Sequence, residues 1–149
     1  MTEIRLRPAV ARDCDAIAEI WHAGASLPGV GPPQMPTVVE LKQRVPREFE
    51  QGWIVTVAES GGRILGFIAV KPTEGALAEL FLRLEVRGHG VGELLMARAR
   101  EQMPDGFTLF TRVGNGPARR FYERQGLVRL REAIHPRFGD AIVYYGWSP

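Results

Sequence analysis

Residues 79–95 read Glu79-Leu-Phe-Leu-Arg-Leu-Glu-Val-Arg-Gly-His-Gly-Val-Gly-Glu-Leu-Leu95. An apolar, strand-like run over residues 77–84 leads into a turn with glycines at 88, 90 and 92, and an amphipathic helix follows without a polar linker. Glycine lets a ligand approach the backbone closely, and the amides and dipole at a helix N-terminus favour an anion. The stretch therefore predicts a pyrophosphate-binding turn between a strand and a helix.

Three kinds of phosphate-binding turn are compared with this stretch. A P-loop needs a Lys-Ser or Lys-Thr pair after its glycines, and the chain contains neither pair. The dinucleotide fingerprint Gly-x-Gly-x-x-Gly is excluded because Glu93 stands where its third glycine should be. The third pattern, Arg-x-x-Gly-x-Gly, is filled by Arg87, Gly90 and Gly92. It closely resembles the acetyl-coenzyme A motif of the GNAT superfamily of N-acetyltransferases, although a turn made only for helix–strand packing could use the same glycines.

A second motif lies the expected distance downstream, after one helix and one strand. It resembles the GNAT signature Asn-x-x-Ala-x-x-Phe-Tyr-x-x-x-Gly-Phe/Leu, and its residues are Asn115, Ala118, Phe121, Tyr122, Gly126 and Leu127. An amphipathic helix with an aromatic pair in the core would explain Phe121 better than Tyr122. Two loose motifs in the right order are accidental far less often than one. The chain is therefore similar to GNAT N-acetyltransferases over nearly its full length.

The pattern of elements agrees with this resemblance. Strands are expected at residues 4–7, 53–58, 64–70, 77–84, 107–113, 127–133 and 141–147. Helices are expected after Asp13 as N-cap, from the capping box Thr37-x-x-Glu40, from Val91 and from Gly116-Pro117, with Pro46 interrupting the second pattern. Residues 24–36 are too rich in glycine and proline for regular structure. We expect one α/β (α+β) domain, residues 1–149, with a mixed, mostly antiparallel twisted sheet of about seven strands flanked by four helices.

Composition restricts the class of protein. With 149 residues, 45% of them hydrophobic and 24% charged, the chain fits one globular domain. A net charge of +2, from 19 basic and 17 acidic residues, does not favour nucleic-acid binding. The single cysteine, Cys14, excludes an intramolecular disulfide and suggests a reducing, cytoplasmic location. No apolar run approaches the roughly 20 residues of a membrane helix, so no membrane partner is expected.

The resemblance implies which residues hold acetyl-coenzyme A (acetyl-CoA). The pyrophosphate would lie on the backbone of residues 88–93, with Arg87 adding positive charge. Those backbone positions are Gly88, His89, Gly90, Val91, Gly92 and Glu93. Backbone groups of Leu82 and Leu84 would pair with the pantetheine arm and polarise the acetyl carbonyl, although many relatives have proline where this chain has Leu84. The other implied contacts are Asn115 with the pantetheine arm and Arg119, Arg120 or Arg124 with the remaining phosphate; no metal is implied.

The implied reaction is attack of an amine on a thioester, with a thiolate as leaving group. Tyr122 stands at the general-acid position of the family motif, and a phenol of pKa about 10 can protonate a thiolate of pKa about 8.5. An alkyl ammonium of pKa about 10.4 also needs a proton acceptor. Glu79 is a candidate, but strand alternation would place it on the face opposite Ala78, the position where some relatives carry a catalytic glutamate. The open alternatives are His22, His135, Asp140 and a water chain to bulk solvent.

Three functions are consistent with the sequence. The first is acetyl-CoA-dependent acetylation of a primary amine on a small molecule. The second is acetylation of a protein or peptide, with residues 24–36 and 134–140 shaping an open groove. The third is a non-catalytic acyl-CoA-binding sensor, which the presence of Tyr122 disfavours. The C-terminal strand at residues 142–145 could pair across a homodimer, although an internal hairpin is the simpler interpretation.

Overall fold

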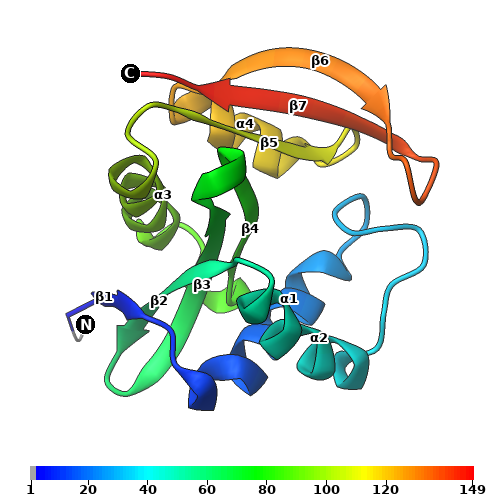
Figure 1. The fold of residues 1–149 in the computed structure, drawn as a ribbon. Coiled ribbons are helices and arrows are strands. Elements are labelled where there is room, and N and C mark those ends of the chain that lie inside the picture. Colours follow the sequence, from blue (N-terminus) through cyan, green and yellow to red (C-terminus); the bar gives the residue numbers. More distant parts are fainter. Residues whose placement is uncertain (1–2) are drawn as a thin grey trace.

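The computed structural model describes residues 3–149, and its elements follow the expected order (Figure 1). The strands are β1 (Arg5–Pro8), β2 (Ile54–Ser60), β3 (Arg63–Lys71), β4 (Ala76–Leu82), β5 (Phe107–Arg112), β6 (Val128–Ile134) and β7 (Ala141–Trp147). The helices are α1 (Cys14–Ala25), α2 (Val38–Glu50), α3 (Val91–Gln102) and α4 (Gly116–Arg124). Three 3-10 turns, η1 (Ala11–Asp13), η2 (Pro72–Glu74) and η3 (Leu84–Val86), precede α1, β4 and α3. The expected mixed fold is confirmed.

The sheet consists of two halves that meet at a single point. Its strand order is β1-β2-β3-β4-β5-β7-β6, and the described neighbours are antiparallel except for the parallel pair β4 and β5. The β4–β5 pairing is restricted to Ala76 opposite Thr108, and beyond it the two strands diverge (Figure 1). We call the space between residues 77–82 and 109–112 the β4–β5 gap. Backbone groups that line this gap lack a partner strand.

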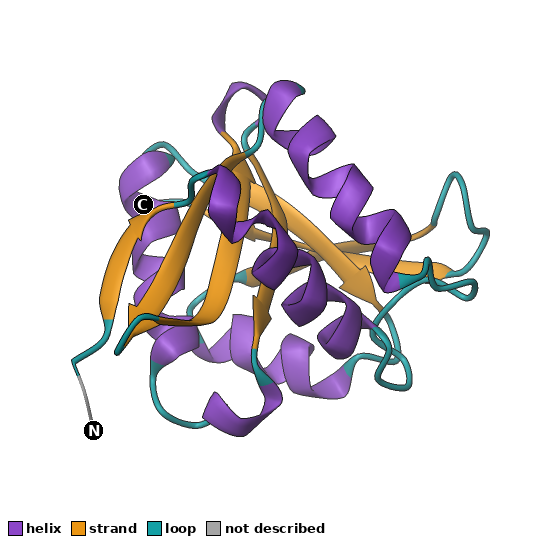
Figure 2. Cartoon of the chain, turned by 90° about the horizontal axis from the view of Figure 1, so that it is seen from below, coloured by secondary structure: helices purple, strands orange, loops and turns teal. Residues whose placement is uncertain are grey.

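Helices cover both faces of the twisted sheet (Figure 2). On one face, α1 and α2 enclose a cluster that includes Ile17, Leu41 and Phe67. On the other face, residues of α3 and α4 pack in a second cluster with the two sheet halves, including Leu95 and Tyr145. The divergence of β4 and β5 therefore lies between two separate apolar layers, where groups from both faces can reach the same space.

Three local expectations need correction. Helix α2 runs through Pro46 to Glu50, because Pro46 faces solvent, where water can replace the lost backbone hydrogen bond. Asp13 stands before α1 but does not cap it, because its carboxylate accepts from the Val10 amide at 2.8 Å and pairs with Arg7 at 2.8 Å. The strand expected through residue 84 ends at Leu82, and a 3-10 turn follows. The capping box is confirmed, with the Glu40 amide 3.1 Å from the Thr37 hydroxyl.

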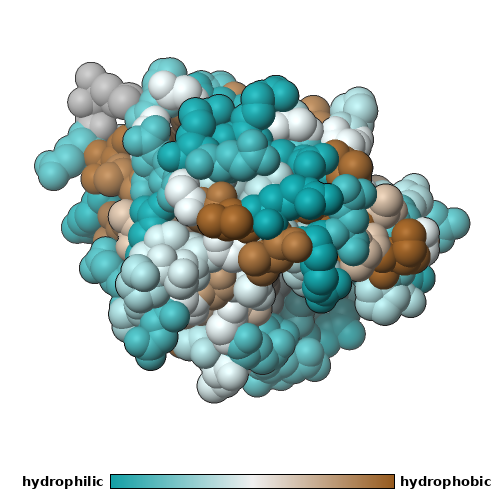
Figure 3. Space-filling view, turned by 90° about the horizontal axis from the view of Figure 1, so that it is seen from above, coloured by the Kyte–Doolittle hydropathy of each residue, from teal (hydrophilic) through white to brown (hydrophobic). Residues whose placement is uncertain are grey.

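The edge strand β6 is exposed along most of its length. Its side chains Val128 and Ile134 are 64% and 65% exposed, and charged residues stand between them. Such charges oppose the addition of further strands to a sheet edge. Figure 3, which views the molecule from above, shows small hydrophobic groups separated by hydrophilic surface. Within residues 3–149, no helix has the length and apolar character needed to cross a membrane.

Candidate functional site

The turn before α3 keeps its backbone open to a ligand. Gly88 and Gly90 both have φ of 82°, a conformation that strains any residue with a Cβ, and the space where a Cβ would stand is empty at both. Gly90 is the N-cap of α3. Within the described chain, no hydrogen bond is formed by the amides of residues 88–93. These amides and the positive end of the helix dipole can bind an anionic group such as a phosphate.

The glycines of this turn are required for two different reasons. A Cβ at Gly92 would lie 3.2 Å from the ring of Phe121, so this glycine allows α3 to approach α4. Packing alone therefore explains Gly92, but it does not explain Gly88 and Gly90, which face open space. The exposed Arg87 side chain forms no ion pair with residues 3–149, so its charge is available beside the open amides. His89 and Glu93 are also exposed at this turn.

The β4–β5 gap supplies further backbone donors. Arg83 donates its amide to the Leu65 carbonyl on β3 at 2.8 Å. Because successive amides of a strand point to opposite edges, the Leu82 amide faces the gap instead. The Leu84 amide, in η3, donates to no backbone carbonyl of residues 3–149. Both predicted backbone positions are therefore free to pair with an extended ligand, although Leu84 lies in a turn rather than in the strand.

Two polar residues assigned to the coenzyme by resemblance make internal contacts. Asn115 is buried, accepts from the Ala118 amide at 3.3 Å as the N-cap of α4, and donates to the Thr111 hydroxyl at 3.1 Å. Arg119 donates from Nε to the Tyr145 hydroxyl at 3.1 Å and from Nη1 to the Val113 carbonyl at 2.8 Å. Arg119 thus ties α4 to β7 and to the end of β5.

Tyr122 packs on the α4 side of the sheet, in the cluster against which Leu80 and Leu82 of β4 also pack. Its side chain is 9% exposed, and its ring lies 5.7 Å from Phe121 and 6.0 Å from Tyr145. Among residues 3–149, none forms a hydrogen bond with its hydroxyl. Burial raises the pKa of Tyr122, and the nearby charge of Glu79 raises it further. The hydroxyl therefore keeps its proton at physiological pH and can act as a donor.

Glu79 reaches the gap from the opposite face because of a β-bulge. Glu79 is opposite Ala69, whereas Val70 is opposite Leu77, so Ala78 is an additional residue in β4. Cross-strand neighbours share a face, and Ala69 belongs to the cluster under α1 and α2. Ala78 packs against the same cluster. The expected alternation, which placed Glu79 away from the face of Ala78, is therefore wrong, and the bulge brings both residues to one side.

The surroundings of Glu79 give it an unusual acidity. It is half-buried, and loss of solvation raises the pKa of Glu79 from 4.5 to about 7, while the charges of Arg44 and Arg112 act in the opposite direction. Arg44 lies on α2 with its guanidinium 4.9 Å from the centre of the Trp21 ring. Neither arginine is marked by a sequence motif. Arg112 belongs to the cluster of basic residues between Arg112 and Arg137, which is its only signal in the sequence. Arg44 lies outside that cluster and has no such signal.

The other candidate bases are less suited to accept a proton. Nδ1 of His135 accepts hydrogen bonds from the amides of Arg137 and Phe138, at 3.1 and 3.2 Å, and burial lowers the pKa of His135. Burial alone would raise the pKa of Asp140. Its hydrogen bond and ion pair with Arg112 lower the pKa by more than burial raises it, so the net shift is downward. His22 lies half-buried on α1. Among the acids and histidines, Glu79 alone combines a pKa near neutrality with an electrostatic interaction with Tyr122.

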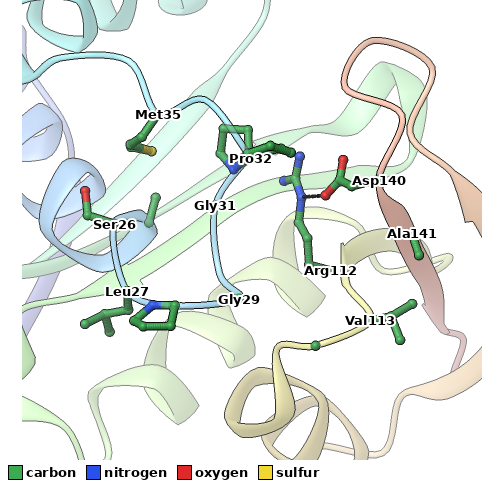
Figure 4. A pocket seen from close by; sticks show the side chains of 14 residues that line it. Ser26, Leu27, Gly29, Gly31, Pro32, Met35, Arg112, Val113, Asp140 and Ala141 are labelled. Carbon is green, nitrogen blue, oxygen red and sulfur yellow. Dashed lines mark hydrogen bonds and ion pairs between the residues drawn. The ribbon is translucent and has the colours of Figure 1, made fainter.

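An open pocket of about 540 Å³ lies between the loop that follows α1 and the ends of β5 and β7 (Figure 4). One wall is the loop between α1 and α2, residues 26–37, which we call the strap. The other wall is formed by residues 112–114 and 140–141. A Cβ at Gly29 would lie 3.2 Å from the Gly114 carbonyl oxygen, so the strap packs closely on the turn after β5. No group of three or more potential metal ligands is found among the described residues.

Known proteins share this arrangement. The sequence model of the acetyltransferase (GNAT) family matches residues 16–127. No curated protein sequence matches the chain. Among solved structures, a GCN5-related N-acetyltransferase from Rhodopseudomonas palustris has a TM-score of 0.77 at 17% identity, covering 100% of this chain and 98% of that one. YncA from Salmonella typhimurium, solved with its cofactor acetyl-CoA, has a TM-score of 0.74 at 14% identity, with coverages of 97% and 93%.

A third similar structure is that of an enzyme named for acetylating a protein. Ribosomal-protein-alanine N-acetyltransferase from Brucella melitensis has a TM-score of 0.73 at 17% identity, covering 97% of this chain and 99% of that one. At such identities the solved structures establish the fold alone. The family match, in contrast, covers most of the sequence, including β4, the motif at Arg87–Gly92 and the second motif at Asn115–Leu127 with Tyr122. The chain belongs to the GNAT family of N-acetyltransferases.

Proposed function

We propose that this acetyltransferase moves the acetyl group of acetyl-CoA directly to a primary amine on a small molecule. The observation that carries the proposal is the position of Tyr122 and Glu79. They lie on opposite faces of the sheet beside the β4–β5 gap, and the charge of Glu79 raises the pKa of Tyr122. An acid and a base at one gap are what the transfer of an acyl group to an amine requires.

The residues present fit acetyl-CoA. Open amides at residues 88–93, with Arg87 beside them, would hold the pyrophosphate, and the free amides of Leu82 and Leu84 would hold the pantetheine arm. Asn115 lies at the same end of the gap as N-cap of α4. Acetyl-CoA would supply an activated acyl group with a thiolate as leaving group. All other roles in the reaction fall to side chains of this protein.

Glu79 is proposed as the general base. With a pKa of about 7 it is partly ionised at neutral pH, and its carboxylate is a stronger base than that of an ordinary glutamate. It would take a proton from the amine as the nitrogen attacks. The bulge at Ala78 supports this role because it directs Glu79 to the side of the sheet where the strap and the pocket lie.

Tyr122 is proposed as the general acid that protonates the departing thiolate. Its raised pKa prevents loss of the proton before the reaction, but it also makes the phenol a weaker acid. Part of that increase comes from the charge of Glu79. Once Glu79 has accepted the amine proton, this charge is neutralised and Tyr122 becomes a stronger acid. Proton uptake at Glu79 would therefore assist proton release at Tyr122.

The strap supports a small-molecule acceptor. It packs against the turn after β5, so the pocket beside the gap has walls on both sides. A volume of about 540 Å³ is in the range of small-molecule sites. A peptide would need a groove that continues past the strap. The Brucella melitensis neighbour carries the name of a protein acetyltransferase, which makes peptide acetylation the second candidate.

Release of free thiol from acetyl-CoA tests the proposal. We expect turnover with a subset of small primary amines and none with a library of N-terminal and lysine-containing peptides. Turnover restricted to peptides would support the second candidate. A thermal shift with acetyl-CoA, but no thiol release with any amine or peptide, would instead identify a binding protein without transferase activity.

A further inference from the structure

We infer that the acceptor carries a carboxylate as well as its amine, and that the terminal nitrogens of Arg112 bind this carboxylate. The inference rests on the proposed function and specifies the class of substrate for the same site. Three independent features of Arg112 support it: terminal nitrogens without a partner, a fixed orientation, and a position in the pocket wall near the charge of Glu79.

The first feature is the free edge of the guanidinium. Within the described residues 3–149, Arg112 donates only through Nε, which lies 3.0 Å from Oδ2 of Asp140. Within residues 3–149, neither terminal nitrogen has a hydrogen-bond partner, and Nη2 is buried. A buried donor without a partner is unfavourable, and two adjacent guanidinium nitrogens match the two oxygens of a carboxylate. The terminal nitrogens, which have no partner within residues 3–149, are therefore suited to a carboxylate.

The second feature is the rigid support of the side chain. The guanidinium carbon lies 5.9 Å from the centre of the Phe110 ring and 5.8 Å from that of Phe138, and Asp140 holds Nε. These contacts come from β5 and from the connection between β6 and β7. An arginine whose direction is already fixed loses little conformational freedom when it binds a ligand.

The third feature is the location. Arg112 and Asp140 form the polar part of a pocket wall that is otherwise largely apolar, with Leu27, Pro32 and Met35 among the strap residues (Figure 4). Figure 4 shows the guanidinium between Pro32 and Asp140. The Arg112 charge also lowers the pKa of Glu79, so the two groups lie near each other, although Glu79 does not itself line the pocket. A molecule with an amine at Glu79 and a carboxylate at Arg112 would be held at both ends.

Other arginines near the site lack this combination. Arg44 also acts on Glu79, but it pairs with Glu48 at 3.4 Å and does not line the pocket. Arg119 has donors committed to Tyr145 and Val113. Arg137 lies on the exposed tip of the connection between β6 and β7. Arg112 is therefore the residue we assign to carboxylate recognition.

The test compares matched acceptors in the acetyl-CoA thiol-release assay. α-, β- and γ-Amino acids are each compared with their own carboxamides, which keep the amine and lose the negative charge. For the wild type, we expect kcat/KM to be at least about 10-fold higher for the best amino acid than for its carboxamide. Arg112→Gln should reduce kcat/KM for that amino acid by about 10- to 100-fold, mainly through KM, and for the carboxamide by less than about 3-fold.

Two further variants separate recognition from folding. Arg112→Lys keeps a charge beside Asp140 but lacks the two-nitrogen edge, so it should retain the melting temperature better and still lose most of the preference for carboxylates. Arg129→Gln, which removes an exposed arginine on β6, should leave the preference unchanged. Equal turnover of amino acids and carboxamides by the wild type would overturn this inference alone. Binding of acetyl-CoA without turnover of any amine would overturn the proposed function and this inference together.

Discussion

The ligand-binding groups that we propose on the two sides of the β4–β5 gap come from different parts of the chain. On the α3 side, the binding groups are backbone amides exposed by left-handed glycines, all within one short stretch. On the α1 and α2 side, they are the side chains of Glu79 and Arg112, which come from β4 and β5. A backbone site depends on local conformation, whereas a side-chain site depends on how distant elements pack. The first can persist through sequence change, and the second can be altered by single substitutions.

The largest effect is expected at Tyr122, which we propose as the acid that protonates the thiolate between the two sides. Tyr122→Phe should lower kcat by about 10²- to 10³-fold, because the leaving group loses its proton donor, while the KM for acetyl-CoA stays within about 2-fold. Steady-state kinetics with an acceptor whose chemistry is rate-limiting measures both values. Tyr144→Phe is the matched control, because it keeps the ring that contacts Phe110 and Arg131 and removes only the hydroxyl. An unchanged kcat in Tyr122→Phe would exclude the acid role.

Glu79→Gln tests the acceptor side. The rate of the wild type should rise with pH through about 7 as Glu79 ionises, and the variant should lose this dependence along with about 10- to 100-fold in kcat/KM at pH 8. A pH–rate profile measures both effects. Glu101→Gln, at an exposed position of α3, should match the wild type. A variant that keeps the same pH dependence would assign the base to another group.

The same substitution should increase stability. Burial raises the pKa of Glu79 from its ordinary value of 4.5 to about 7 in the folded protein, so folding favours the protonated form. The wild type therefore loses stability as pH rises from about 4.5 through 7, and the neutral glutamine does not. Because Glu79 is partly accessible to solvent, we expect a gain of only about 1–2 kcal/mol at pH 8 and almost none at pH 4. Urea unfolding at both pH values measures the difference, and equal stabilities at pH 8 would contradict it.

Gly90→Ala tests the backbone side. A Cβ at φ of 82° costs about 1–2 kcal/mol, and relaxation of the turn would displace the open amides, so the KM for acetyl-CoA should rise about 10-fold with kcat less affected. Gly62→Ala is the matched control, because Gly62 has φ of 79° in the β2–β3 turn and likewise faces open space. Both variants should lose similar stability, but only Gly90→Ala should weaken acetyl-CoA binding. Equal KM values for acetyl-CoA in Gly90→Ala and Gly62→Ala would show that the turn is not part of the binding site.

The smallest effect on activity is expected for Arg119→Gln. This variant tests whether Arg119 contacts acetyl-CoA or only stabilises the fold. Its two internal hydrogen bonds should make this variant about 1–2 kcal/mol less stable, with the KM for acetyl-CoA changed by less than about 3-fold. Thermal unfolding and steady-state kinetics measure the two quantities. An increase in KM above about 10-fold would instead favour the phosphate contact expected from the sequence.

The sequence was sufficient to predict what depends on local pattern. Strand alternation, the capping box at Thr37 and two spaced motifs predicted the order of the elements and the turn at Gly88 and Gly90. The face of Glu79 could not be predicted, because the bulge at Ala78 arises from the pairing of β3 with β4 and has no signature in one strand. The free edge of Arg112 was equally hidden, since it depends on Phe110, Phe138 and Asp140 meeting around one side chain.

The single pairing of β4 with β5 has a consequence for measurements of amide exchange. Central strands usually exchange their amide hydrogens most slowly, because both edges are protected by neighbours. Here the amides of Leu80 and Leu82 face the β4–β5 gap in the middle of the sheet, and no strand protects them. They should exchange faster than the Phe81 amide between them, whose edge pairs with β3. Exchange at these two positions would thus report occupancy of the gap without any label or substitution.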